Sequence, residues 1–314
     1  MARRRMLVVM NPSAHDWEAR DRWPQLEPVL AATGELTLLN TVADNAETVA
    51  SVAEKVRAGF DRVVAIGGDG TVRLVCSGIL RGAPQKPPEL AVIPFGTANN
   101  VSKSLKLPLD DLRAMAQIAG GERLTGLDVC WAALDSPSGK SEHVWVNCVG
   151  VGMDADVVAA RGRYRGLGSY TSYAAAMAER ALEQRSLDVA LTLDGAATQH
   201  RVFNAVVTNV PLYAGALAMP NARMDDGILD VYLFGRNEYG SKVLSYFIKQ
   251  ADILDLGVSG LLDEVTQNQR EFHGREVRIR LAYPRAVQVD GDAVGEASDM
   301  VLRVVLQLRT ACGT

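Results

Sequence analysis

The sequence lacks an apolar run long enough to cross a membrane as a helix. A spanning helix needs about 20 predominantly apolar residues, and Lys, Arg, Asp or Glu interrupts every candidate stretch of the 314 residues. The apolar run that follows the basic start MARRR is about five residues long, too short for the core of a signal peptide. We therefore expect a cytoplasmic protein, whose contact with a membrane would be peripheral, at the inner membrane surface.

Paired cysteines and metal-binding clusters of histidine are also missing. The four cysteines form no CxxC pair, and three of them lie in apolar stretches: Cys76, Cys130 and Cys148. This usage favours reduced thiols over a disulfide framework or a zinc site. The four histidines have no metal-ligand spacing.

An excess of positive charge is absent as well. The formal net charge is −4 and the pI is about 5.7, so the overall charge gives no reason to expect a nucleic-acid partner. No internal repeat or low-complexity segment occurs. With 48% hydrophobic and 22% charged residues, the composition is that of a globular protein with room for two domains.

The first 120 residues alternate short β-rich runs with helical periodicity. Strands are predicted at 6–10, 35–39, 62–66 and 89–94, with helices near 23–32 and 45–58 and a further helical segment between the last two strands. This alternation predicts a parallel sheet covered by helices, with ligands bound beyond the carboxyl ends of the strands.

The pattern changes after Gly120-Gly121, where most segments are apolar strands joined by turn residues. Two helical stretches interrupt this β-rich half, near 169–185 and 239–256. The apolar segment 243–262 overlaps the second of them. Core packing explains most of that segment, and a lipid-facing lip beside a cleft is the alternative.

Residues 65–71 read AIGGDGT, directly after an apolar strand. Glycines here permit positive φ and let a phosphate approach backbone N–H groups, and a following helix N-terminus favours an anion. The stretch is neither GxxxxGK[ST] nor GxGxxG. A tight turn with Asp69 or Thr71 as a helix cap explains the same residues equally well.

The junction after the next strand favours the phosphate-binding interpretation. PFGTANN, residues 94–100, again puts Gly-Thr and amide side chains where a strand gives way to a helix. Two such junctions one strand apart would line a single cleft.

GGDGT followed by PxGTxN resembles the diacylglycerol kinase catalytic family, which includes sphingosine, ceramide and bacterial lipid kinases; NAD kinases and phosphofructokinases are more distant relatives. The resemblance extends to Asn11-Pro12, to the strand 127–129 and to the loop 289–295, VDGDAVG, which resembles the family's DGE loop. Further matches are Asn147, Gly152, Asp154 and the loop residues Tyr213, Gly215, Pro220, Ala222, Asp226, Gly227, Leu229 and Asp230.

The resemblance implies a fold of two parts. Residues 1–127 would form an α/β ATP-binding domain with a parallel sheet, similar to that of NAD kinase and phosphofructokinase. Residues 128–302 would form a β-rich, sandwich-like domain for the lipid substrate. The tail, about 303–314, would return to pack on the first domain.

The resemblance also implies the site. Asp290 would be the general base for a lipid hydroxyl, and Asp69 would share in catalysis and bind Mg²⁺. Asp226 would belong to a second cation site. The implied ATP-binding residues are Asn11, Gly67, Gly68, Asp69, Gly70, Thr71, Gly96, Thr97, Asn99 and Asp292.

Two positions depart from the family pattern. Asn100 stands where Asp is common, and Asp292 stands where Glu is usual, which alters charge at the first and reach at the second. VDGD is also a good type I′ hairpin sequence by itself, and MDDGILD, residues 224–230, reads as a plain turn before a strand. The basic cluster Arg161, Arg163 and Arg165 is explained either as a solvated loop or as a site for anionic headgroups or phosphates.

We therefore expect an ATP- and Mg²⁺-dependent lipid kinase that phosphorylates a lipid alcohol such as diacylglycerol or a sphingoid base. A kinase of the NAD kinase type, with a soluble substrate, is one alternative. A catalytically silent lipid- or nucleotide-binding regulator is the other. The sequence identifies neither the lipid nor the oligomeric state.

Overall fold

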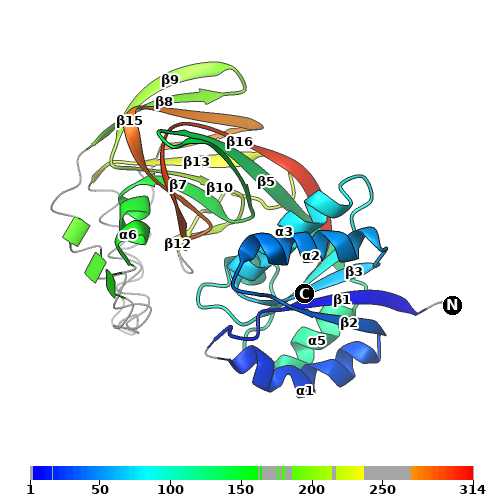
Figure 1. The fold of residues 1–314 in the computed structure, drawn as a ribbon. Coiled ribbons are helices and arrows are strands. Elements are labelled where there is room, and N and C mark those ends of the chain that lie inside the picture. The colour runs from blue at the N-terminus through cyan, green and yellow to red at the C-terminus, as the bar shows by residue number, and fades with distance from the viewer. Residues whose placement is uncertain are drawn as a thin grey trace, which may run out of the picture.

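The computed structural model describes residues 3–15, 17–161, 163–164, 175–176, 179–180, 186–213, 217–236 and 270–313. It contains an α/β half and a β-rich half (Figure 1). The helix predicted for 239–256 and the segment 243–262 lie outside the described residues, and the helix predicted for 169–185 lies largely outside them. Within the described part, no helix is long and apolar enough to span a membrane.

The N-terminal half is built on parallel strands, as the alternating pattern predicts. Their order is β2-β1-β3-β4, and every pair among them runs parallel. The strands are β1 (Arg4–Met10), β2 (Gly34–Asn40), β3 (Arg62–Gly67) and β4 (Glu89–Pro94). The helices are α1 (Glu18–Ala31), α2 (Asn45–Arg57), α3 (Asp69–Gly82), α4 (Asn100–Ser104) and α5 (Leu112–Gly120).

Helices cover both faces of this sheet because successive strand residues point to opposite sides. In β3, Val63 and Ala65 pack in the core that includes α2 and α3, whereas Val64 and Ile66 pack in the core that includes α1 and α5. Strands buried on both faces read as continuous apolar runs, which is why RVVAI identifies this strand in the sequence.

The first helix is longer than predicted. We expect a helix near 23–32, and α1 begins at Glu18. Its first turns are rich in charge, which masks the apolar periodicity, but Ala19 is buried with Leu26 and Leu30 on the face toward the sheet.

The C-terminal half is mostly antiparallel strands around a separate apolar core, as predicted. Its strands are β5 (Leu124–Ser136), β6 (Gly139–Trp145), β7 (Cys148–Gly152), β8 (Leu187–Leu193), β9 (Ala196–Val202), β10 (Asn204–Thr208), β11 (Leu212–Tyr213), β12 (Leu217–Ala218), β13 (Leu229–Phe234), β14 (Arg270–Gly274), β15 (Glu276–Val289) and β16 (Asp292–Ala311). One helix of this half, α6 (Met153–Arg161), follows β7 directly.

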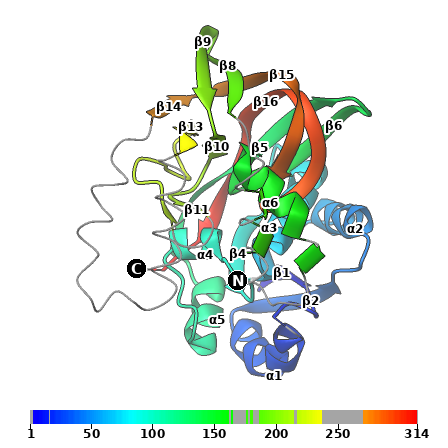
Figure 2. The same ribbon diagram turned by 90° about the vertical axis from the view of Figure 1, so that its left-hand side faces the viewer.

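The last strand joins the two halves (Figure 2). β16 pairs antiparallel with β15 near its start and with β5 along most of its length, and it meets β4 in parallel at Thr310. Its first part contributes Met300 to the C-terminal core, and its end contributes Leu308 to an N-terminal core. Beyond it, the Gly313 N–H donates to the Leu105 carbonyl (2.9 Å). The sheet therefore continues from one half into the other.

Candidate active site

The two glycine-rich loops touch through their backbones. A Cβ added to Gly96 would lie 2.5 Å from the Gly68 Cα, and one added to Gly68 would lie 3.0 Å from the Gly96 Cα. A side chain at either position would push the loops apart. The loops after β3 and β4 thus form one continuous surface at the carboxyl ends of neighbouring parallel strands, where ligands of such sheets bind.

Asp69 binds the second loop rather than its own helix. The residue before α3 is Gly68, which makes no side-chain cap, and the Asp69 carboxylate accepts hydrogen bonds from the backbone N–H groups of Asn100 (3.0 Å) and Val101 (3.1 Å). The alternative interpretation of Asp69 as a cap of the helix that follows it is therefore not what the structure shows: its carboxylate caps α4. Burial raises the pKa of this carboxyl, and those N–H groups oppose the shift.

Asp290 sits in the turn between β15 and β16. Its φ of 50° and the φ of 85° at Gly291 are both positive, as a type I′ hairpin requires, so this prediction is confirmed. Oδ2 accepts from the Val146 N–H (2.9 Å). Oδ1 accepts from the N–H groups of Asn147 (2.8 Å) and Cys148 (3.0 Å). The carboxylate thereby holds the connection between β6 and β7.

Burial raises the pKa of Asp290 to about 6, against the opposing charge of Arg73 and the three backbone N–H groups. An ionised carboxylate has about four lone-pair positions, and these three bonds leave one on Oδ2. The group therefore keeps the capacity to accept one more hydrogen.

Asn147 lies between the two aspartates. Its backbone N–H donates to Asp290, and its side-chain amide interacts with the Asp69 carboxyl and lowers that group's pKa. Only 2% of Asn147 is exposed. One buried asparagine thus joins the glycine loop of the first half to the hairpin of the second.

Arg73 is a site residue that the sequence analysis missed. It lies on α3, one turn after Gly70, and its guanidinium donates to the Val289 carbonyl (3.2 Å) and to Oδ2 of Asp292 (2.5 Å). Asp292, predicted as a nucleotide-binding residue, therefore forms an ion pair across the two halves. No local signal reveals this pair, because its partners are 219 positions apart.

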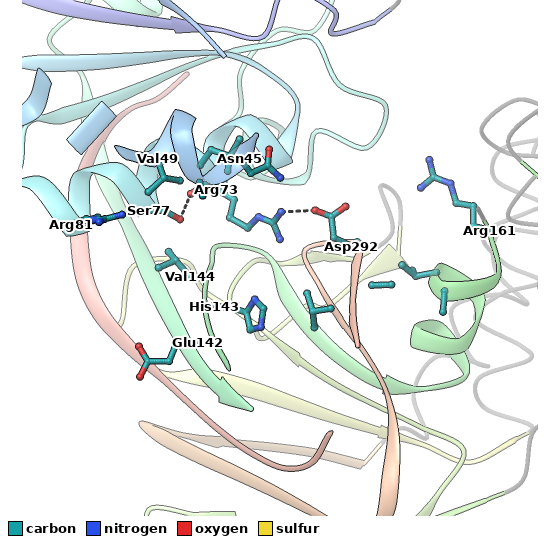
Figure 3. Close-up of a pocket in the computed structure, with 17 residues that line it drawn as sticks. Asn45, Val49, Arg73, Ser77, Arg81, Glu142, His143, Val144, Arg161 and Asp292 are labelled. Atoms are coloured by element: carbon teal, nitrogen blue, oxygen red, sulfur yellow. Dashed lines mark hydrogen bonds and ion pairs between the residues drawn. The ribbon is translucent and has the colours of Figure 1, made fainter. Parts of the chain in front are cut away.

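A cavity of about 910 Å³ opens beside this ion pair (Figure 3). Its walls come from both halves of the molecule: α2 and α3 on one side, and β6, α6 and the β15–β16 hairpin on the other. Arg73, Ser77 and Arg81 line it from α3. Small-molecule ligands of many kinds bind in pockets of about 300–1,000 Å³.

A buried polar network supports the hairpin from behind. Asp154 Oδ2 accepts from the Tyr213 hydroxyl (2.8 Å) and from Gln288 Nε2 (3.1 Å). Gln288 Oε1 in turn accepts from the Gly291 N–H (2.8 Å). Burial raises the pKa of Asp154 to about 6, opposed by these side-chain donors. The network fixes the turn that carries Asp290.

The remaining predicted nucleotide residues lie around the glycine loops. The Asn11 N–H donates to the Ile66 carbonyl beside the first loop. The Thr71 side chain is buried under Gly67, where an added Cβ would lie 2.3 Å from Thr71 Oγ1. The Asn99 amide bonds both the N–H and the carbonyl of Gly96, and Thr97 is exposed.

Asp226 belongs to a different group of acids. Its Oδ1 accepts from the Ile228 N–H (3.0 Å), and its charge helps to raise the pKa of Asp128 and of Asp230, after the larger effect of burial. Among the described residues, no group of three or more His, Cys, Asp or Glu is arranged to hold a metal ion. The cation role of Asp226 stays a prediction.

Comparison with known protein families identifies the family to which this chain belongs. Residues 5–132 match the diacylglycerol kinase catalytic domain, and residues 147–308 match the YegS C-terminal NAD kinase beta sandwich-like domain. The chain belongs to the diacylglycerol kinase catalytic family. The resemblance stated from the sequence motifs is thus confirmed for both halves.

One relative of known name is similar to part of this chain. A diacylglycerol kinase of Staphylococcus saprophyticus is 29% identical over 129 residues, which span 40% of this chain and 41% of the relative. The aligned stretch thus covers less than half of the length of that relative.

Solved structures share the fold. A diacylglycerol kinase from Bacillus anthracis superposes with a TM-score of 0.71 at 20% identity, over 99% of this chain and 97% of that one. Yeast NADH kinase complexed with NADH gives a TM-score of 0.53 at 12% identity, over 100% of this chain and 84% of the other. The predicted combination of a kinase-like α/β half with a β-rich half is confirmed.

Proposed function

We propose that this protein is an ATP-dependent lipid kinase that transfers the γ-phosphoryl group to the hydroxyl of a lipid alcohol. The observation that carries the proposal is the convergence of Asp69 and Asp290 on Asn147 at the junction of the two halves. Family membership supports phosphoryl transfer, and the names of relatives support a lipid acceptor.

The glycine loops are proposed to hold the phosphates of ATP. Gly70 faces open space, where an added Cβ would meet nothing within 4 Å, so a ligand can approach the backbone there. The first turn of α3 adds a favourable dipole for an anion. The cavity beside Arg73 has the size for the rest of the nucleotide.

The residues present fit an Mg²⁺ ion that arrives with ATP. Such an ion takes one or two protein carboxylates and completes its shell with phosphate oxygens and water. Asp69 accepts hydrogen bonds from the N–H groups of Asn100 and Val101 and from the side chain of Asn147, which leaves about one of its four acceptor positions. When bound, the ion would neutralise phosphate charge.

Asp290 is proposed as the general base. Its remaining lone pair on Oδ2 can accept the hydrogen of the acceptor hydroxyl as the oxygen attacks phosphorus. A pKa of about 6 leaves the carboxylate ionised at neutral pH while making it a stronger base than an ordinary aspartate.

The test is transfer of labelled γ-phosphate from Mg-ATP to a panel of lipid alcohols in mixed micelles, including a diacylglycerol, a sphingoid base and a ceramide, with NAD as the soluble acceptor. We expect one lipid class to be labelled, and Asp290→Asn to abolish the labelling while ATP binding persists. Labelling of NAD instead would establish a soluble-substrate kinase. ATP binding with transfer to no acceptor would support a regulatory protein.

A further inference from the structure

Arg73 connects the nucleotide loop to the catalytic hairpin through a single side chain. It follows Gly70 by three positions on α3, so a movement of the glycine loop is transmitted along a rigid helical turn to its guanidinium. That guanidinium contacts the chain 216 and 219 positions later, at Val289 and Asp292. Figure 3 shows the side chain reaching across to Asp292.

The two contacts bracket Asp290. Val289 pairs with Asp292 as the last pair of the β15–β16 ladder, and Asp290 and Gly291 form the turn between them. Arg73 therefore holds both residues that flank the turn, one through its carbonyl and one through its carboxylate. Aspartate and glycine both accept the positive φ that this turn requires, and Arg73 fixes the strand ends on either side of the turn.

The environment makes this anchor effective. The Arg73 side chain is 13% exposed, whereas that of Asp292 is 60% exposed. A largely buried guanidinium needs its hydrogens bonded, and the carbonyl of Val289 and the carboxylate of Asp292 provide partners from one strand pair. The contact joins two charged groups, and a charge-assisted hydrogen bond is stronger than a neutral one.

We propose that Arg73 is a positioning residue for Asp290: it locks the catalytic hairpin onto the helix that begins in the phosphate loop. This proposal rests on the proposed kinase function. In this proposal, the ion pair between Arg73 and Asp292 sets the distance and direction of Asp290 relative to the bound phosphates.

The charge of Arg73 has a measurable consequence that a purely structural role would not have: it should affect the pH at which Asp290 ionises. Arg73 is the charged group of α3 that lowers the pKa of Asp290. Two carboxylates lie near Asp290: Asp292, which pairs with Arg73, and Asp69, which is linked to Asp290 through Asn147. The thiols of Cys76, Cys130 and Cys148 are also close, and burial and the charge of Asp290 raise their pKa values. Burial has the largest effect on the pKa of Asp290 and raises it, and Arg73 is the largest influence that lowers it, so removal of the Arg73 charge should raise this pKa further.

The experiment measures kcat, KM for ATP and the pH profile of kcat for the wild type and four variants, using the lipid acceptor that the panel identifies. Arg73→Gln removes the charge and the lock. We expect kcat to fall by about tenfold or more, and the acid limb of the profile to move up by about one pH unit because Asp290 loses an opposite charge. KM for ATP should change less than kcat.

Two further variants separate charge from geometry. Arg73→Lys keeps the charge but cannot reach both acceptors, so we expect kcat to fall while the acid limb stays near that of the wild type. Asp292→Asn leaves Arg73 without its counter-charge, so the limb should stay or move to lower pH. Loss of folding would lower the activity of any variant, but it would not raise the acid limb in Arg73→Gln while leaving it in place in Arg73→Lys.

Arg278→Gln is the matched control. It removes a charged Arg–Asp pair, with Asp299, from the same β15–β16 ladder but far from its turn, and we expect kcat and the acid limb to be unchanged. An active wild type whose Arg73→Gln variant keeps both kcat and the limb would overturn the role of Arg73 and leave the kinase intact. A wild type that labels no acceptor would overturn both.

Discussion

The glycine loop of the first half and the hairpin of the second use an aspartate in similar ways. Asp69 accepts two backbone N–H groups from α4, and Asp290 accepts three from the connection after β6. In both places a carboxylate fixes a neighbouring segment, and burial raises its pKa. The geometry around them differs: Asp69 begins a helix beside close-packed glycines, whereas Asp290 occupies a tight hairpin turn.

This difference indicates a division of labour. Backbone packed against backbone, as at Gly68 and Gly96, creates a surface of N–H groups suited to phosphate. A buried carboxylate with one lone pair left and a pKa of about 6 is suited to accept a proton. Under the proposed function, the first half binds the phosphates and the second half accepts the proton.

The largest effect is expected at Asp290. Asp290→Asn keeps the shape of the side chain but removes the proton acceptor, so we expect kcat to fall by about a thousandfold, with the dissociation constant of Mg-ATP nearly unchanged. Rapid-quench transfer assays and nucleotide titration measure the two quantities. A loss of nucleotide affinity as large as the loss of kcat would contradict the proposal that Asp290 acts in transfer and not in binding.

Asp69→Asn should affect the use of Mg-ATP by the first half. The amide retains an acceptor for one N–H of α4 but loses the negative charge, and we expect kcat/KM for Mg-ATP to fall by about a hundredfold, with a higher Mg²⁺ concentration needed for half-maximal rate. Rates measured across an Mg²⁺ series check this. An unchanged Mg²⁺ requirement would exclude Asp69 from the metal environment.

Gly96→Ala tests the contact between the loops. The new methyl group would meet the Gly68 Cα at 2.5 Å and Asn99 Oδ1 at 2.6 Å, so we expect nucleotide affinity to fall by about tenfold and the free energy of unfolding to fall by about 2 kcal/mol. Chemical denaturation and titration measure these changes.

A matched variant on the same loop is Gly70→Ala, whose methyl group would enter open space. It should leave the free energy of unfolding within about 0.5 kcal/mol of the wild type, as for surface substitutions. Equal destabilisation by both alanines would show that the loops do not need their close contact.

The smallest expected effect is the pH dependence of the wild type. Because the pKa of Asp290 is about 6 and the base acts when ionised, kcat should be half of its plateau near pH 6 and should fall further as the pH drops. A steady-state profile from pH 5 to 8 checks it. A plateau that continues down to pH 5 would exclude a base with this pKa.

Local patterns predicted the scaffold and much of the site. RVVAI identifies β3 because a strand buried on both faces is apolar throughout, and VDGD predicts the hairpin because Asp-Gly favours positive φ. The motifs around Gly68 and Gly96 are recognisable for the same reason: each consists of residues adjacent in the sequence.

Two features were beyond such patterns because they depend on tertiary packing. The capping of α4 by Asp69 joins two loops across neighbouring strands, and propensity alone assigns that carboxylate to its own helix. The partnership of Arg73 with Asp292 joins opposite ends of the chain, and an arginine three residues after Gly70 resembles any helix surface residue.

The most direct test compares Gly96→Ala with Asp290→Asn in one pair of assays: Mg-ATP binding by titration and γ-phosphate transfer to lipid in a single turnover at saturating ATP. The account predicts that Gly96→Ala weakens binding but transfers phosphate at nearly the wild-type rate once ATP is bound, whereas Asp290→Asn binds normally and fails to transfer. If Asp290→Asn transferred phosphate at the wild-type rate, the hairpin would not carry the base and the division between the two halves would be wrong.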